Sequence, residues 1–236
     1  MAILNVTPDS FYSGSRLSSP SQVLTVAQRA LEDGATLLDI GACSTRPNSQ
    51  PVSSETEWQR LEPALDILRS SLPDASLSLD TYRPEIARRA IEQFGPMIIN
   101  DISGGCDEMF SLVREKQVPY IWTLRGDYDL LDRMDAMAGI DLILDPGLGF
   151  TGGVDPDYEC LRRLDRLQTY QLPILVGVSR KSMIYRLLNL TPETALTATQ
   201  VLHFYALQHG ATILRVHDVP EAMQTLTLYN KLYNNI

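Results

Sequence analysis

Polar and charged residues follow one short apolar run after another along this chain of 236 residues. Each run is rich in residues typical of strands, so each polar residue is expected at the end of a strand. Carboxylates and amides beside a lysine suit a planar heterocycle that forms hydrogen bonds through its edges. The residues in question are Asn5, Asp9, Asp39, Asp80, Asn100, Asp101, Asp145, Lys181, Arg215 and His217.

A second group of residues suits an anion. Arg215 offers a fixed fork of donors to phosphate oxygens, and His217 and the dipeptide Ser44-Thr45 add further donors. The side-chain oxygen of Asn5 is a neutral ligand that is compatible with Mg²⁺ shared with a diphosphate. The chain therefore has the residues for a ligand with a flat ring and an anionic group.

Several of these residues also have purely structural interpretations. Asp39 could bond to nearby loop backbone, and Asp101 could cap the turn that begins at Ser103. Lys181 could sit at a helix start, although a cation is unfavourable there because it opposes the helix dipole. Gly147-Leu148-Gly149 could be only a tight turn. His203 and His209 lie on a predicted helix and are expected to be solvated or at the edge of the core.

The elements that must position these residues alternate between strand and helix. Strands are predicted at residues 3–5, 35–40, 76–80, 96–101, 119–123, 140–145, 173–178 and 211–217. The longer helices are predicted at residues 20–33, 57–72, 84–94, 108–116, 158–169, 194–208 and 221–233.

This alternation indicates an α/β fold with a parallel sheet. A glycine precedes four of the strands, at Gly34, Gly95, Gly139 and Gly210. Eight strand and helix units in about 250 residues are typical of a single (β/α)8 TIM barrel, so we expect one domain over residues 1–236. A doubly wound open sheet is the alternative, but it would not need eight units. In such barrels the chemistry lies at the carboxyl ends of the strands, so the polar residues should converge.

Composition limits the function classes. The net charge is −9, so no general basic surface is available for nucleic acid. No apolar run reaches about 18 residues, and the N-terminus lacks a basic region, so neither a membrane span nor a signal peptide is expected. Three widely spaced cysteines, Cys43, Cys106 and Cys160, favour a reducing cytoplasm over a disulfide framework or a zinc site.

Seven motifs, in order along the chain, resemble the signatures of the dihydropteroate synthase family. They begin at Asn5, Ser44, Asp80, Ile99, Asp145, Ser179 and Arg215, and read NVTPDSF, STRP, DT, INDISGG, DPG, SRKS and RVHD. The set covers nearly the whole chain and is specific as a set. The resemblance implies the condensation of (7,8-dihydropterin-6-yl)methyl diphosphate with 4-aminobenzoate, to give 7,8-dihydropteroate and diphosphate.

The resemblance also implies roles for individual residues. Asp80, Asn100, Asp145 and Lys181 would hold the pterin ring, with Phe150 also binding substrate. Thr45, Arg215 and His217 would hold the diphosphate, and Asn5 would reach Mg²⁺. The 4-aminobenzoate pocket would lie near Asp9, Phe11, Thr45, Arg46, Pro47 and Ser182. Asp9, Asp80, Lys181 and Arg215 are the expected catalytic residues. Homodimers are usual in the family, and sulfonamides resemble 4-aminobenzoate.

The chain departs from the family pattern in four places. Most members have a strand hairpin before the first motif, and here the chain begins inside the first strand. Thr123-Leu124-Arg125-Gly126 replaces the usual His-Met-Arg-Gly, and Thr151-Gly152-Gly153 replaces the usual Gly-Lys. Only residues 127–139 separate the fifth strand's loop from the sixth strand. Two alternatives stay open: a non-catalytic pterin-binding paralogue, and a methyltetrahydrofolate-binding methyltransferase domain.

Overall fold

A computed structural model describes residues 1–6, 19–43, 52–126, 128 and 130–233 of the chain. Its contacts divide it into two compact units. Unit 1 comprises Met1–Trp122 and Met137–Asp141, and unit 2 comprises Thr123–Ala136 and Leu142–Ile236. The single domain over residues 1–236 stays a prediction.

Unit 1 is built on parallel strands that pair in chain order. The strands are β1 (Ala2–Asn5), β2 (Leu38–Gly41), β3 (Leu77–Asp80), β4 (Ile98–Asp101) and β5 (Tyr120–Thr123). Every pair from β1·β2 to β4·β5 is parallel. Apolar residues fill most positions, because side chains on both faces of the sheet are buried. The predicted parallel sheet is confirmed for this unit.

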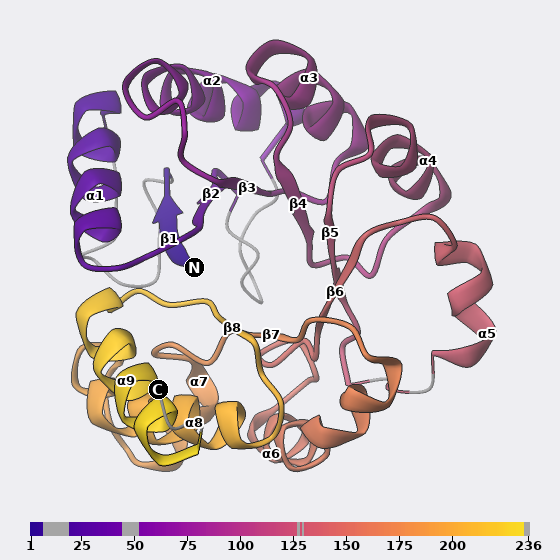
Figure 1. Cartoon of the computed structure of the whole chain (residues 1–236). Helices are drawn as coiled ribbons and strands as arrows, with labels where there is room; N and C mark the ends of the chain where they lie inside the picture. Colours follow the sequence, from indigo (N-terminus) through magenta and orange to yellow (C-terminus); the bar gives the residue numbers. More distant parts are fainter. Residues whose placement is uncertain (7–18, 44–51, 127, 129, 234–236) are drawn as a thin grey trace. The chain divides into compact units, whose positions relative to one another are not determined.

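Four helices connect these strands, as the alternation predicts. They are α1 (Pro20–Glu32), α2 (Ser54–Ser71), α3 (Pro84–Phe94) and α4 (Asp107–Lys116). Each helix packs on the next in chain order, and Figure 1 shows them following one another along the strands. Ser19 caps α1 and Ser53 caps α2 through their side-chain oxygens. The Ser53 cap explains why α2 begins before the predicted Glu57.

Unit 2 contains the remaining strands, which are short. They are β6 (Leu142–Asp145), β7 (Leu175–Val176) and β8 (Ile213–Leu214). A bridge joins Leu144 to Ile174, and β7 pairs with β8 in parallel. The last two strands are shorter than predicted, but Arg215 N still donates to Val176 O at 3.0 Å, so backbone pairing continues past the named ends.

The helices of unit 2 are α5 (Leu131–Met134), α6 (Val154–Arg162), α7 (Ser182–Leu187), α8 (Leu196–Gln208) and α9 (Val219–Tyr233). Three 3-10 helices accompany them at Asp135–Met137, Leu164–Tyr170 and Pro192–Thr194. The helix predicted over residues 158–169 is therefore wrong in its bounds. The backbone leaves the α region at Arg163, where φ is −98° and ψ is 10°, and the chain continues as a 3-10 helix.

The glycines predicted to end helices before strands are confirmed. Gly34, Gly95, Gly139 and Gly210 all have positive φ, between 77° and 105°. This left-handed conformation favours glycine and lets the chain turn back into the next strand. Among the helices that the structure describes, none is both long and apolar enough to cross a membrane.

Candidate active site

The carboxyl ends of the strands in unit 1 carry a row of four residues in register. Asn5 is opposite Gly41, Gly41 is opposite Asp80, and Asp80 is opposite Asn100. Side chains of register partners point to the same face of a parallel sheet, and adjacent strands lie about 4.8 Å apart. The structure therefore brings together the three predicted site residues of unit 1, Asn5, Asp80 and Asn100.

Gly41 makes room in this row. A Cβ atom added there would lie 3.1 Å from Asp80 Cβ and 3.4 Å from its carboxylate. A side chain at this position would press on Asp80 and shift it. The glycine of the motif Asp-Ile-Gly is thus explained by the carboxylate on the neighbouring strand.

A buried polar network joins Asn100 to Asp39 and Ser78, which lie two residues before Gly41 and Asp80 on their strands. Asp39 and Ser78 are register partners, and Ser78 Oγ donates to Asp39 Oδ1 at 2.6 Å. Asn100 Nδ2 approaches the two Asp39 oxygens at 3.3 and 3.2 Å. All three side chains are buried. The interpretation of Asp39 as a residue bonded to loop backbone is therefore replaced by a bond network across three strands.

Asp101, next to Asn100, serves the scaffold. Its Oδ1 accepts a bond from Ser103 N at 2.7 Å, and its Oδ2 accepts one from Tyr120 Oη at 2.9 Å. The structural interpretation of this residue as the cap of the following turn is thus confirmed. Asn100 and Asp101 are neighbours at the end of β4 but have different partners, because successive side chains of a strand point to opposite faces of the sheet.

Lys181, a predicted catalytic and substrate-binding residue, belongs to unit 2. It precedes α7, and its backbone is extended (φ −75°, ψ 159°). The ammonium donates to Leu148 O and lies 5.2 Å from the centre of the Phe150 ring, a cation–π distance. Lys181 is the N-cap residue of α7, so its position at a helix start is confirmed, although its side chain forms no cap bond to the helix. The two predicted substrate-binding residues, Lys181 and Phe150, are in contact.

The turn after β6 brings Asp145 toward the same part of unit 2. Asp145 is buried, and its Oδ1 accepts a bond from Gly147 N at 2.8 Å. Gly147 has φ of 81°, and a Cβ there would lie 2.6 Å from Arg125 N. Gly149 packs on the Lys181 stem, since an added Cβ would lie 3.1 Å from Lys181 Cδ. Gly147-Leu148-Gly149 is a tight turn that leaves space for a backbone approach and for the lysine.

Arg215 and Lys181 both approach Gly177. A Cβ added to Gly177 would be 3.7 Å from both Lys181 Nζ and Arg215 Cβ, so the missing side chain leaves space beside both residues. His217 follows, and its backbone N donates to Ser179 Oγ at 3.2 Å. Burial, together with the charges of Arg215, Arg180 and Lys181, lowers the pKa of His217 to about 4 against the opposing effect of Asp218. The imidazole is therefore neutral at pH 7 in the free protein.

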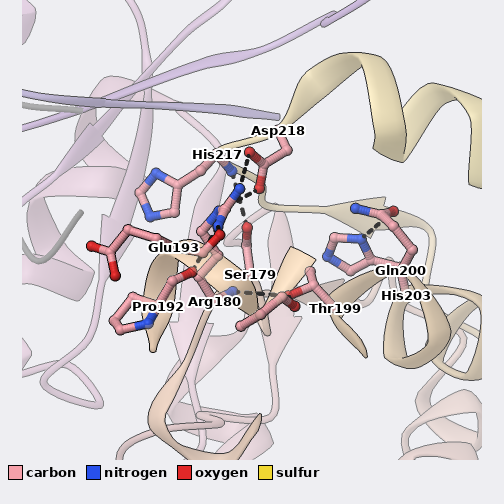
Figure 2. Close-up of polar contacts among 10 residues, drawn as sticks. Ser179, Arg180, Pro192, Glu193, Thr199, Gln200, His203, His217 and Asp218 are labelled. Carbon is pink, nitrogen blue, oxygen red and sulfur yellow. Dashed lines mark hydrogen bonds and ion pairs between the residues drawn. The ribbon is translucent and has the colours of Figure 1, made fainter. Parts of the chain in front are cut away.

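The ion pair between Arg180 and Asp218 joins the motif SRKS, which begins at Ser179, to the motif RVHD, which begins at Arg215, as Figure 2 shows. Arg180 Nε and Nη2 donate to Asp218 at 2.8 and 2.9 Å, and Arg180 Nη1 donates to the carbonyls of Pro192 and Glu193, both at 2.7 Å. The backbone N of Arg180 donates to Thr199 Oγ1 at 3.2 Å. Arg180 has φ of 53°, a conformation that these bonds stabilise. Its neighbour Lys181 is thereby fixed in place.

Four predicted site residues lie outside the described residues: Asp9, Thr45, Arg46 and Pro47. Phe11 belongs to the same group. Ser182 is described and is the first residue of α7, directly after Lys181.

Sequence reasoning missed the roles of three residues. Ser78 sits inside a predicted strand, and Arg180 was noted only as part of its motif. Thr123 ends β5, and its Oγ1 is buried without a hydrogen-bond partner among the described residues. The available signal for Ser78 and Thr123 was a polar residue within or at the end of an apolar strand.

The donor set of the described residues limits how a metal could bind. Among them, no three His, Cys, Asp or Glu side chains gather as a metal site would require. The Asn5 amide offers one neutral oxygen at the row in unit 1. This set does not fit a cage built from protein alone, but it fits Mg²⁺ held mainly by substrate phosphates and water.

Comparison with known proteins identifies the family of the chain. The family model described as "Pterin binding enzyme" matches residues 1–129 and 131–217. A dihydropteroate synthase of Streptococcus pyogenes is 34% identical, with 98% of this chain and 94% of that protein covered. A dihydropteroate synthase of Bacillus subtilis is 34% identical, with 99% and 88% covered.

Solved structures give the same result. A Yersinia pestis dihydropteroate synthase, in complex with a sulfonamide drug, matches with a TM-score of 0.90 and 32% identity, covering 99% of this chain and 93% of that one. The enzyme of Xanthomonas albilineans with 4-aminobenzoic acid has a TM-score of 0.86 and 34% identity, covering 98% and 91%. The predicted (β/α)8 TIM barrel class is thereby confirmed. The chain belongs to the pterin binding enzyme family, and its activity is that of the dihydropteroate synthases, transferases of folate biosynthesis.

Proposed function

We propose that this protein joins (7,8-dihydropterin-6-yl)methyl diphosphate to 4-aminobenzoate through the residues described above. The observation that carries the proposal is the in-register row of Asn5, Asp80 and Asn100 in a chain of this family. The proposal assigns each residue a task.

Asp80 and Asn100 hold the pterin ring from unit 1. A carboxylate accepts hydrogen bonds from ring N–H and amino groups, and a side-chain amide can donate and accept. Asp145, Lys181 and Phe150 are also assigned to the ring, and the proposal is supported by the Lys181 ammonium lying 5.2 Å from the centre of the Phe150 ring and donating to Leu148 O. Negative charge from Asp80 and Asp145 favours the ring as it becomes electron-poor.

Arg215 and His217 hold the diphosphate. Arg215 offers paired donors to phosphate oxygens, and Lys181 Nζ, which approaches the same glycine, Gly177, is assigned to the same anion. His217 is neutral before the substrate arrives, so it offers one N–H donor, and a bound diphosphate would favour its protonated form. Thr45, outside the described residues, is assigned to the same anion.

The reaction exchanges one bond for another. The bond from the pterin methylene carbon to the diphosphate oxygen breaks, and the electron pair leaves with diphosphate. Positive charge develops on the methylene and negative charge on the leaving group, which Arg215, Lys181 and His217 stabilise. The amine nitrogen of 4-aminobenzoate forms the new carbon–nitrogen bond and loses a proton. The chain supplies binding, orientation and charge, and needs no side-chain nucleophile.

Asn5 is the residue assigned to Mg²⁺. Its amide oxygen would be one ligand, with the others from diphosphate and water. Bound Mg²⁺ would neutralise part of the charge on the leaving group. Asp9, Arg46, Pro47 and Ser182 are assigned to the 4-aminobenzoate side, and a sulfonamide would compete there.

The test is a diphosphate-release assay with the full chain, the pterin diphosphate and Mg²⁺. We expect release to be slow without 4-aminobenzoate and to rise when it is restored, with 7,8-dihydropteroate as the second product. Folded protein that binds the pterin diphosphate and releases nothing would instead identify a non-catalytic paralogue. Binding of methyltetrahydrofolate without any dependence on diphosphate would favour the methyltransferase domain.

We also propose that a second copy of the chain covers an apolar face of unit 2. The exposed large apolar side chains of the described residues, apart from Val26, belong to α7, α8, α9 and the turn after α7: Leu187, Leu188, Leu190, Val201, Leu228, Leu232 and Tyr233. α8 and α9 pack together, and Phe204 contacts Tyr229 and Tyr233. Such a patch marks an interaction surface.

Light scattering after size exclusion tests the dimer. We expect a homodimer for the natural chain and a monomer for Val201→Glu combined with Leu228→Glu. Val26→Glu, on α1, is the matched control and should leave the dimer intact. A natural chain that is monomeric at high concentration would contradict the proposal.

The proposed compartment is the cytoplasm, because the three cysteines are free thiols.

A further inference from the structure

The buried carboxylate of Asp39 determines which way the Asn100 amide faces. Carboxylate oxygens accept hydrogen bonds, and the group that Asn100 turns toward them is its NH₂ group, which donates to both. The distances from Asn100 Nδ2 to the Asp39 oxygens are 3.3 and 3.2 Å. With the amide reversed, two oxygens would face each other in a buried site, which is strongly unfavourable.

Ser78 fixes the carboxylate in turn. Its hydroxyl donates to Asp39 Oδ1 at 2.6 Å, the length of a strong bond to a charged acceptor. Asp39 and Ser78 are directly opposite each other in the β2·β3 ladder, so the register itself sets this bond. The carboxylate is therefore oriented before any ligand binds.

With its NH₂ group bonded to Asp39, the Asn100 amide has its oxygen, Oδ1, left for another partner. Asn100 is 2% exposed, and its Oδ1 is buried without a hydrogen-bond partner among the described residues. A buried carbonyl oxygen left unpaired is unfavourable, because it has lost its bonds to water. An oxygen in this state, on a residue in the row with Asp80, is suited to a ligand that brings a donor.

We propose that Asp39 is a positioning residue, which acts through Asn100 to set the hydrogen-bonding polarity of the ring site. It holds Asn100 as an acceptor, so this position selects a heterocycle with an N–H or amino group there and disfavours a ring that presents only a lone pair. The inference rests on the proposed function, because it takes Asn100 to contact the pterin ring. Asp39 itself has no ligand contact in this proposal.

Asp39→Asn is the direct test, because an amide at residue 39 can donate as well as accept and so allows Asn100 to reverse. We expect the KM for the pterin diphosphate to rise about tenfold, equivalent to about 1.4 kcal/mol. The KM for 4-aminobenzoate should stay within about twofold, since the change acts on one substrate. Asp66→Asn, on the exposed side of α2, is the matched control and should leave both values unchanged.

A double-mutant cycle separates positioning from a general structural effect. In an Asn100→Ala background, Asp39→Asn should add less than about twofold, because the group it orients has been removed. Fully additive losses, or equal rises in both KM values, would overturn the proposal. Thermal unfolding of each variant shows whether it folds, and Ser78→Ala, which removes one bond to the carboxylate, should give a smaller change of the same pattern if Asp39→Asn does not fold.

The same variants distinguish this proposal from the proposed function. Absence of turnover by the natural chain would reject the proposed function. The affinity for pteroic acid, measured by calorimetry, would then test the ring site alone. Turnover by the natural chain with unchanged pterin KM in Asp39→Asn would leave the function intact and reject the role of Asp39.

Discussion

Arg180 donates from Nε and Nη2 to both carboxylate oxygens of Asp218, at 2.8 and 2.9 Å. The pair joins a residue next to Lys181 with a residue next to His217. The guanidinium also donates to the carbonyls of Pro192 and Glu193, so these donors are used inside the protein. The second residue of the Ser-Arg-Lys-Ser motif therefore organises the motif and leaves anion binding to its neighbours.

Breaking this pair should be costly. The side chains are 5% and 13% exposed, so Asp218→Asn leaves a buried guanidinium without its counterion, and we expect a loss of about 3–5 kcal/mol in the free energy of unfolding. Urea denaturation measures it. Glu159→Gln is the control, because it breaks an exposed pair with Arg162 and should cost under about 1 kcal/mol. Equal effects of the two variants would contradict the assignment.

A second buried ion pair, in unit 1, permits a matched comparison on one helix. Glu57 in α2 is buried, accepts a bond from Thr81 Oγ1 at 2.7 Å and pairs with Arg83. We expect Glu57→Gln to lower the free energy of unfolding by about 3 kcal/mol. Glu55→Gln, in the same first turn, affects only exposed contacts, with Arg89 and Gln59, and should change the free energy of unfolding by less than about 1 kcal/mol.

The comparison of these two variants also controls for the helix dipole. Both glutamates lie in the first turn of α2, where a carboxylate is favourable, so that contribution is shared. Chemical denaturation of the two variants side by side should show a clear difference. Similar midpoints would mean that the buried pair is not a net source of stability.

His203 predicts a dependence of stability on pH. Burial in α8 lowers its pKa from 6.5 to about 4. Above pH 6.5 the ring is neutral in both states and the protein has its full stability. As pH falls from 6.5 to 4, only the unfolded chain takes up the proton, so the free energy of unfolding falls, by up to about 3 kcal/mol. His217, with its pKa also lowered to about 4, adds a loss of the same sign.

Denaturation curves at several pH values isolate the part due to His203. We expect His203→Gln to flatten the decline between pH 6.5 and 4 relative to the natural chain. His209→Gln, at the end of the same helix, is the control and should leave the slope as it is. A slope that is unaltered by His203→Gln would refute the assignment.

Lys181 carries the strongest prediction for turnover. We expect Lys181→Met to lower kcat/KM by about 100-fold or more, because it removes a cation that is fixed beside the developing negative charge. The fold should persist, since methionine keeps the packing of the stem against Gly149. Lys231→Met, at the exposed end of α9, should turn over normally. Near-normal turnover by Lys181→Met would remove this residue from the mechanism.

The sequence predicted the order of elements and the strand ends better than the bounds of the elements. Apolar runs and glycines marked where strands begin, and the polar residues after them fall in register in unit 1. Capping by Ser53 and the change to a 3-10 helix at Arg163 depend on local backbone geometry, which apolar periodicity does not report.

The polar network was harder to predict because its bonds cross the sheet. Asp39, Ser78 and Asn100 come from three strands, and no spacing along the chain shows that they meet. Arg180 is similar, because its partner Asp218 is 38 residues away. Family resemblance assigned substrate contacts to particular residues, while the bonds that orient those residues became visible only with atomic contacts.

Because the bond between Asp39 and Ser78 joins direct partners of the β2·β3 ladder, recognition depends on how the chain aligned its strands during folding. A slip of β2 by one residue along β3 would keep backbone pairing but send the Asp39 side chain to the face opposite that of Ser78. A misaligned molecule could thus remain compact and lose its ligand. Ligand affinity in a refolded sample therefore reports strand alignment, which a measurement of secondary-structure content would miss.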